Sequence, residues 1–343
     1  MSLNPVERHA PAVRGLQARK QVVMSDEFAL SLNLARHAHD RDSSSRSLEG
    51  HLDHVWADTS TRVILLQKGK AIARPSADET SAALEFFTVK HIEPLGFTSV
   101  DALYLGRSHD GATSYLALNL PEHATFETSA GCQWIDLRVW GHAMSDIDTG
   151  LFTQALALAN WHANHGFAPA TGEPTTPTSS GWVRSTNSSA QVFPRTDVAV
   201  IVLVTDADDR VLLGNNAMWE PNRFSLLAGY VDPGESLEAA VIREVFEESG
   251  MTVERPTYLG SQPWPFPASL MVGFTATVKS GHADDLLRPD GEEILTLRWF
   301  SRDELRTSLD DIVLPGRTSI ARSMLEHWLG EPLDQNAVWL GQR

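Results

Sequence analysis

Three glutamates with helical spacing are the residues best suited to do chemistry. Glu244, Glu247 and Glu248 lie in the segment Gly229–Met251, which reads GYVDPGESLEAAVIREVFEESGM. At 100° per residue their side chains share one face of a helix, where their negative charges repel one another. A divalent cation among the oxygens would relieve this repulsion, because Mg²⁺ binds a few carboxylates together with substrate phosphates. Arg243 can hold the carboxylates in place through a bidentate hydrogen bond.

The neighbouring residues predict the helix that must position these glutamates. Pro233-Gly234 breaks the chain, Ser236 is a suitable N-cap, and Gly250 closes the helix after Ser249. A separate apolar stripe should pack on a sheet, and it consists of Val241, Ile242, Val245 and Phe246. An isolated cluster of this kind could equally be a solvated acidic face, so the wider spacing decides the interpretation.

That wider spacing resembles the Nudix box. The box reads Gly, five residues, Glu, seven residues, Arg-Glu, an apolar residue, any residue, Glu-Glu, any residue, Gly and an apolar residue. A chance match to its seven strict positions has a probability of about one in 10⁸ per starting point. Every position is filled here, by Gly229, Glu235, Arg243, Glu244, Val245, Glu247, Glu248, Gly250 and Met251.

The resemblance implies roles for individual residues. The catalytic group would be Glu248, Glu247 and Glu244, with Glu248 the first choice for the general base and Glu293 the second. The ligands of Mg²⁺ or Mn²⁺ would be the carbonyl of Ala228 together with Glu244, Glu247, Glu248 and Glu293. Glu292 stands beside Glu293, so the assignment could be displaced by one residue. Structural roles would fall to Gly229, Glu235, Arg243 and Gly250.

A second motif, SQPWPFPAS at Ser261–Ser269, resembles the signature of the NADH pyrophosphatase branch of the Nudix hydrolases. Alternating prolines stiffen such a loop at low entropic cost. The alternative is a proline-rich loop with two core aromatic residues. The resemblance implies a substrate-binding set that also includes aromatic contacts and a backbone contact from the last helix: Phe193, Tyr230, Gln262, Pro263, Trp264, Pro265, Phe266, Pro267, Ala268, Ser269 and Ala321.

The pattern of elements predicts an α+β protein in three parts. Residues 1–145 should form a smaller β-rich domain, with strands at 61–66, 103–107 and 114–120, and a hairpin turn after the first. Residues 146–193 should hold a helix over 150–165, capped by Asp148 or Thr149, and a ribbon-like connector. Residues 194–343 should form the Nudix α/β/α sandwich with a mixed sheet. It would begin with the strand 198–204 and end with a helix over 319–328.

The connector departs from the family pattern. Many members carry two Cys-x-x-Cys pairs there, but the corresponding positions here are Ala168, Thr171, Ser185 and Ser188. None supplies a thiolate, so we expect no structural zinc. His162 and His165 are more consistent with ordinary helix residues than with zinc ligands, and packing through Trp182 and Phe193 should hold the connector together.

Composition limits the remaining possibilities. The 343 residues carry a formal net charge of −16, which argues against a general nucleic-acid binder. The only cysteine, Cys132, excludes an intramolecular disulfide and is expected to be buried. The chain lacks an apolar run of eighteen residues and a signal-peptide core near its start, so we expect a cytoplasmic protein and no membrane partner.

The resemblance implies an enzyme that hydrolyses the diphosphate bond of NAD(H), giving nicotinamide mononucleotide and AMP. NADH or NAD⁺ would be the small-molecule substrate, and the same site could remove NAD caps from RNA. The protein would be a homodimer, and the N-terminal domain, which shows no chemical cluster, would mainly serve dimer assembly. The alternatives are a Nudix pyrophosphatase acting on ADP-ribose or a nucleoside triphosphate, and a non-catalytic nucleotide-binding regulator.

Overall fold

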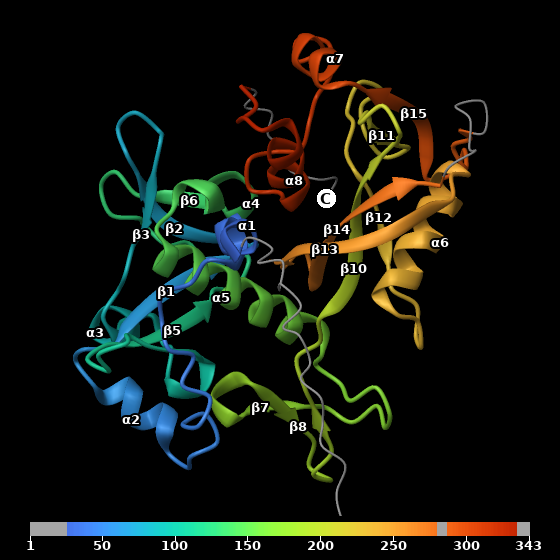
Figure 1. Ribbon diagram of the computed structural model, residues 1–343. Coiled ribbons are helices and arrows are strands. Elements are labelled where there is room, and N and C mark those ends of the chain that lie inside the picture. The colour runs from blue at the N-terminus through green and yellow to red at the C-terminus, as the bar shows by residue number, and fades with distance from the viewer. Residues whose placement is uncertain (1–25, 280–286, 335–343) are drawn as a thin grey trace, which may run out of the picture.

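A computed structural model describes residues 26–279 and 287–334, and it shows two sheets with a smaller antiparallel sheet beneath them (Figure 1). The first sheet has the strand order β3-β2-β1-β5-β4, and β6 pairs with β2. β1 and β5 run parallel, whereas β1 and β2 form the antiparallel hairpin expected after residue 66. The strands are β1 (Arg62–Gln67), β2 (Lys70–Pro75), β3 (Ala82–Leu84), β4 (Leu103–Arg107), β5 (Ser114–Asn119) and β6 (Gln133–Asp136).

Helices surround this first sheet. The longest, α5, packs its apolar side chains into the core on one face of the sheet. The helical segments are α1 (Asp26–Ser31), η1 (Asn33–Ala35), α2 (His51–Ala57), α3 (Val89–Ile92), η2 (Glu93–Leu95), η3 (Ser99–Asp101), α4 (Leu137–Trp140), η4 (Gly141–Ala143) and α5 (Asp146–Asn164).

The second sheet has the order β13-β14-β10-β11-β15, with β12 paired to β10. β10 pairs in parallel with β14. Its centre is completely apolar, which suits a strand that is covered on both faces of the sheet. Its elements are β10 (Asp197–Thr205), β11 (Val211–Asn216), β12 (Leu227–Tyr230), α6 (Leu237–Ser249), β13 (Val253–Trp264), β14 (Ser269–Val278), β15 (Ile294–Phe300), α7 (Arg302–Thr307) and α8 (Ile320–Leu329).

The two faces of this sheet are covered by different helices. Val241 and Val245 of α6 enter one apolar core, while Met324 and Leu325 of α8 enter the other. The mixed α+β architecture and the mixed sheet between helices agree with the expectation from the sequence. Among the residues that the structure describes, no helix is both long and apolar enough to cross a membrane.

The connector folds as a small antiparallel sheet of β7 (Thr176–Thr178), β8 (Val183–Ser185) and β9 (Gln191–Val192), with η5 (Ser179–Gly181) between the first two. Trp182 packs on the first core and donates its indole N–H to the Tyr104 carbonyl at 2.8 Å. Phe193, by contrast, is 60% exposed, so the expectation that it holds the connector together is wrong. Cys132 is buried, as expected.

Two local predictions need correction. The helix expected at 150–165 begins at Asp146, because Ser145 is its N-cap and accepts a hydrogen bond from the backbone N–H of Asp148. In α6, Val241 and Val245 are buried, but Ile242 and Phe246 are exposed. The buried face of α6 turns instead toward Glu248 and Ser249, so half of the expected apolar stripe faces outward.

Candidate active site

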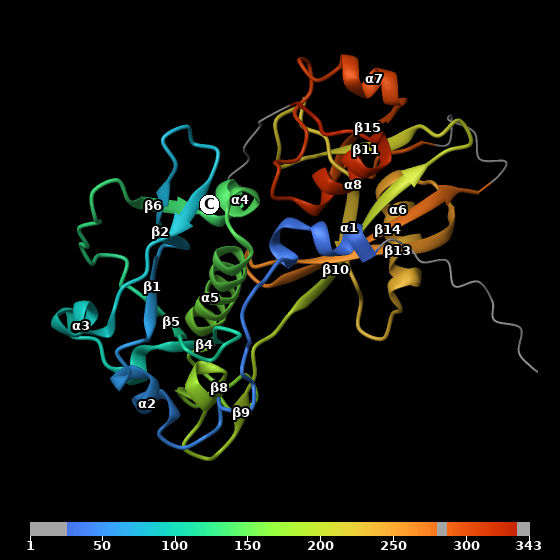
Figure 2. The same cartoon turned by 60° about the vertical axis from the view of Figure 1, so that its left-hand side comes forward.

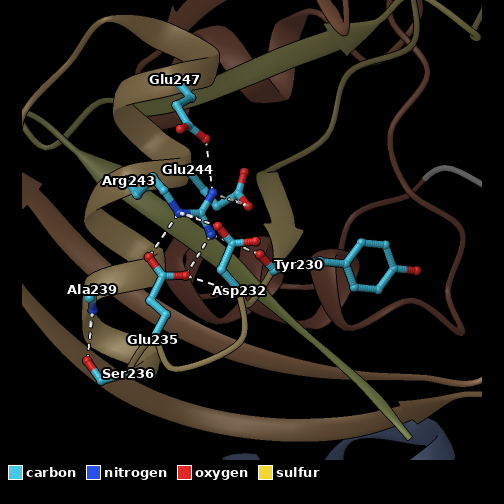
Figure 3. A network of polar contacts seen from close by, with 8 residues as sticks. All are labelled: Tyr230, Asp232, Glu235, Ser236, Ala239, Arg243, Glu244 and Glu247. Atoms are coloured by element: carbon cyan, nitrogen blue, oxygen red, sulfur yellow. Dashed lines mark hydrogen bonds and ion pairs between the residues drawn. The ribbon is translucent and has the colours of Figure 1, made fainter.

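Arg243 is the centre of a charged network on α6 (Figure 3). Its guanidinium donates to both carboxylate oxygens of Glu235, at 2.9 and 2.7 Å. One terminal nitrogen donates to Glu244 at 2.8 Å and to Glu247 at 2.9 Å, and the other also reaches the Tyr230 carbonyl at 2.9 Å. These carboxylates hold the pKa of Arg243 well above its usual value. The arginine thus fixes the glutamates of the helix relative to the loop before it.

Glu244 approaches β12 closely at Gly229. A Cβ on Gly229 would lie only 2.0 Å from the carboxyl carbon of Glu244. The helix starts as predicted, since Ser236 accepts a hydrogen bond from the N–H of Ala239, and it ends at Gly250 in the left-handed conformation with φ 71°. The sequence therefore sets both the start of α6 and the close approach of Glu244 to the strand.

Glu248 lies on the buried side of this cluster and is only 4% exposed. Burial, helped by the nearby charges of Glu293 and Glu244, raises the pKa of its carboxyl to about 9. Its Oε2 atom is buried and has no hydrogen-bond partner among the described residues. A buried acceptor without a partner is costly unless something else satisfies it, so this oxygen is suited to a cation or a proton.

Glu293 approaches the same site from the turn directly before β15. It lines the cavity beside Glu248, whereas Glu292 does not. The Asn216 side chain donates to the Glu293 carboxylate at 3.4 Å, and Asp290 accepts hydrogen bonds from the backbone N–H groups of this turn. The structure therefore favours Glu293 over its neighbour as the downstream acidic residue.

These side chains fit a divalent cation of the kind that shares its ligands with a substrate. Burial and the nearby acids raise the pKa of Glu244 as well as that of Glu248. In the described ranges, no three acidic, histidine or cysteine side chains lie together in a way that could hold a metal ion by themselves. Mg²⁺ commonly takes only one or two carboxylates and completes its shell with water and phosphate oxygens. Glu244, Glu247, Glu248 and Glu293, with the Ala228 carbonyl, remain the predicted ligands.

A cavity of about 750 Å³ extends from the acidic cluster toward the first sheet. Its floor includes Ile201, Ala228 and Met271 of the second sheet, and its rim includes residues 315–317 and 319–321. The opposite wall belongs to the N-terminal part of the chain, through Asp78–Thr80, Arg138–Trp140 and His142–Ala143. The volume lies within the range of sites that bind small ligands.

That opposite wall was missed from the sequence. Arg138, Trp140 and His142 carry no recognisable motif, and they reach the cavity only because α4 and η4 pack against the α8 end of the second sheet. Their participation weakens the expectation that the N-terminal domain serves mainly in dimer assembly.

The proline-rich motif forms the end of β13 and its turn into β14. Trp264 lines the cavity and meets Phe266 in an edge-on contact, with ring centroids 4.9 Å apart. Arg138 lies over the Phe266 ring at 4.1 Å, and the Asn160 side chain donates to the Pro265 carbonyl at 2.8 Å. Pro263 lies in β13, while Pro267 and Ala268 belong to the turn. The loop is thus held by the N-terminal part of the chain.

The remaining predicted substrate residues occupy contrasting positions. Ala321 is buried and lines the cavity. Tyr230 is 56% exposed, and its hydroxyl lies 3.1 Å from that of Ser269, while Phe193 projects into solvent. Gln262 is fully buried, and its amide is already hydrogen-bonded within the protein. A direct contact between Gln262 and a substrate would therefore require those bonds to break.

Hydroxyl and carboxylate groups link the connector turns that carry the substituted cysteine positions. The Glu173 carboxylate accepts hydrogen bonds from Ser188 at 2.5 Å and from Thr171 at 3.3 Å. His162 is engaged on both ring nitrogens, with Arg184 and the Gly181 carbonyl each at 2.8 Å. Both nitrogens of this ring are therefore engaged within the protein, and the absence of structural zinc stays a prediction from the sequence.

Comparison with known proteins matches both halves of the chain. Residues 195–322 match the NUDIX domain model, and residues 60–161 match the model of the NADH pyrophosphatase-like rudimentary NUDIX domain. An NAD-capped RNA hydrolase NudC from Mycobacterium bovis is 41% identical over 239 residues, which cover 66% of this chain and 75% of the relative.

Two further relatives resemble this chain. The mouse protein named NAD(P)H pyrophosphatase NUDT13, mitochondrial, is 35% identical over 62% of this chain and 63% of its own length. An NAD-capped RNA hydrolase NudC from Stutzerimonas stutzeri is 38% identical over 59% of this chain and 70% of the relative.

Proposed function

This chain belongs to the Nudix hydrolases, in the group with an NADH pyrophosphatase-like N-terminal domain, and we propose that it hydrolyses the diphosphate bond of NAD(H). The products would be nicotinamide mononucleotide and AMP. The observation that carries the proposal is the buried Glu248 carboxylate, which has an unpartnered oxygen and lines one cavity with Glu293 and Trp264.

The residues divide the work of the reaction between them. Glu244, Glu247, Glu248, Glu293 and the Ala228 carbonyl would hold Mg²⁺ or Mn²⁺, which when bound offsets charge on the diphosphate. With the cation bound, Glu248 would be ionised and would accept a proton from the attacking water, because it is buried beside the cavity. Arg243 would keep Glu244 and Glu247 in place, since it is bonded to both.

The cavity also suits the two halves of a dinucleotide. Trp264 and Trp140 both line it, and aromatic rings offer stacking surfaces to bases. The names of the relatives support both free NAD(P)H and NAD-capped RNA as substrates, because the two share the same diphosphate. ADP-ribose or a nucleoside triphosphate remains the alternative.

The homodimer is part of the proposal. Phe193 and Tyr230 are large, exposed aromatic residues, and they would contact substrate across subunits. The cytoplasmic location stays a prediction from the sequence.

A product assay tests the proposed function. The purified protein is incubated with NADH, NAD⁺, ADP-ribose and a nucleoside triphosphate in Mg²⁺ or Mn²⁺, and the products are separated by chromatography. We expect the fastest turnover with NADH or NAD⁺, giving AMP and the mononucleotide. Turnover of ADP-ribose or the triphosphate alone would retain the Nudix chemistry and reject the substrate.

NAD-capped RNA is tested separately. Decapping should release the mononucleotide and leave a 5′-monophosphate RNA, and Glu248→Gln should abolish both this reaction and the hydrolysis of free NAD(H). Loss of only one activity in that variant would mean that the two reactions use different sites.

A further inference from the structure

Gln262 joins three parts of the protein that are distant in sequence. Its Oε1 accepts a hydrogen bond from the Leu34 backbone N–H at 3.2 Å, and its Nε2 donates to the Thr318 carbonyl at 3.0 Å. The side chain is fully buried. Because one partner is a donor and the other an acceptor, a neutral amide satisfies both, while a carboxylate or a hydrocarbon cannot.

One of these partners, Thr318, lies directly beside the cavity wall. Thr318 stands between Arg317 and Ser319, which both line it, and Ser319 is the N-cap of α8. Gln262 itself pairs across the sheet with Met271, which lies in the cavity floor. One amide therefore ties the floor to the α8 rim.

Leu34 belongs to a segment, residues 28–36, that we call the strap. In Figure 2 the blue α1 at its start lies between α5 and the orange strands of the second sheet. Phe28 and Leu32 enter the core of the second sheet, whereas Leu34 enters the core of the first. The strap thus packs with both halves, although the sequence-based division places it in the N-terminal domain.

Glycines allow this strap to approach both halves closely. A Cβ on Gly260 of β13 would lie 3.0 Å from the Leu32 side chain. A Cβ on Gly141 of η4 would lie 2.6 Å from the Leu34 side chain and 2.9 Å from that of Thr318. These approaches place the strap, η4 and the α8 rim in direct contact.

Further hydrogen bonds connect the strap with η4 and with the α8 rim. The Asn33 side chain donates to the Arg317 carbonyl at 2.7 Å. Arg36 donates to the carbonyls of Gly141, at 3.0 Å, and Met144, at 3.2 Å. The N-terminal wall and the α8 rim of the cavity are therefore attached to one strap, and Gln262 attaches that strap to the floor.

We propose that Gln262 is a positioning residue that sets the spacing of the cavity walls through the strap, and so controls how well the cavity holds its dinucleotide substrate. It acts on binding and not on the acidic cluster, which Arg243 holds independently on α6. The inference rests on the proposed function for the identity of the substrate alone. The sequence motif that contains Gln262 would then shape the site from behind.

The test compares Gln262→Leu and Gln262→Glu with Tyr258→Phe, a control on the same strand whose hydroxyl makes only a long 3.4 Å contact with Ser261 among the described residues. Leucine leaves two buried backbone groups without partners, and glutamate turns an acceptor toward the Thr318 carbonyl. We expect KM for NAD(H) to rise about tenfold, with kcat within about threefold of the wild type and no change in the control.

Hydrogen exchange gives a readout that does not depend on the substrate. Exchange should become faster in residues 31–37, 137–143 and 315–321 of both Gln262 variants, while α6 stays protected. Unchanged exchange in those segments, or a fall in kcat at constant KM, would overturn the proposal. A wild-type protein inactive on NAD(H) would reject the proposed function, and the exchange experiment would still decide the role of Gln262.

If Gln262→Leu does not fold, Asn33→Ala tests the same joint with a milder change. It removes only the bond to the Arg317 carbonyl, so we expect a smaller rise in KM and faster exchange in residues 315–321. No effect on either quantity would overturn the proposal.

Discussion

The first sheet (β1–β6) and the second sheet (β10–β15) are built on a similar plan, but the helices beside them differ. In each sheet two neighbouring strands run parallel, β1 with β5 and β10 with β14. The first region matches the rudimentary model and the second the NUDIX domain model. The long helix of the first region, α5, is buried along most of its length, whereas α6 buries one face and presents an acidic cluster on the other.

This difference indicates where the chemistry resides. Each helix carries a buried acid whose pKa is raised, mainly by burial: Asp148 in α5 and Glu248 in α6. Asp148 is satisfied by its surroundings, since its carboxylate accepts a hydrogen bond from the Leu84 N–H. Glu248 retains an unpartnered oxygen and lines the cavity. The buried acid that lacks a hydrogen-bond partner and lines the cavity therefore distinguishes α6 and the second sheet as the region that carries the proposed chemistry.

The largest expected effect comes from Glu248→Gln. It removes the proposed base and a metal ligand while keeping the side-chain volume, so kcat should fall by about 10³ or more. The metal-free variant should melt no lower than the wild type at neutral pH, because burial and the nearby acids raise the pKa of Glu248 to about 9, so this carboxyl is already uncharged before the substitution. Steady-state kinetics and thermal melting in EDTA provide the measurement, and near-normal turnover would remove Glu248 from the mechanism.

Substitutions of the neighbouring residues Glu293 and Glu292 test which of them is the downstream acidic residue of the site. Glu293→Gln should lower kcat/KM by at least about tenfold, since Glu293 lines the cavity and its charge reaches Glu248. Glu292→Gln should change it little, because Glu292 lies outside the cavity lining. Titration of activity with Mn²⁺ measures the effect. A larger loss in the Glu292 variant would show that the predicted position is displaced by one residue.

The sequence predicted α6 well because its signals are local. Ser236, Gly250 and the glutamate spacing act within a few residues of the helix, so its bounds follow from the chain alone. The burial of Glu248 and the exposure of Phe246 depend on how the helix rotates against the sheet, which spacing does not fix. The buried hydrogen bonds of Gln262 could not be predicted for a related reason: its partners are 228 and 56 residues away in the chain.

A substitution in the connector between the two halves should have a smaller effect, on stability. Glu173→Ala should lower stability by about 1 kcal/mol, because its carboxylate accepts bonds from both Thr171 and Ser188. Glu122→Ala, an exposed residue outside this cluster, serves as the control. Thermal melting measures both. A purified protein containing one zinc ion per chain, released on unfolding, would contradict our prediction that the connector holds no structural zinc.

The smallest effect, Asp148→Asn, tests whether the buried acid of α5 is structural. Asparagine keeps an acceptor for the Leu84 N–H, so kcat should be unchanged and stability should shift by no more than about 1 kcal/mol. The pH dependence of the free energy of unfolding distinguishes the variant from the wild type. Since burial raises the pKa of Asp148 in the folded state, the unfolded chain releases that proton first as the pH rises above about 4, and the folded state loses stability across this window.

The asparagine variant cannot release that proton, so its stability relative to the wild type should increase as the pH rises through the folded pKa. Urea unfolding at several pH values from about 3.5 to 7 measures the difference. A parallel pH dependence in the two proteins would mean that folding does not raise the pKa of Asp148. A loss of kcat in Asp148→Asn would instead assign a catalytic contribution to the first half and break the contrast between the two helices.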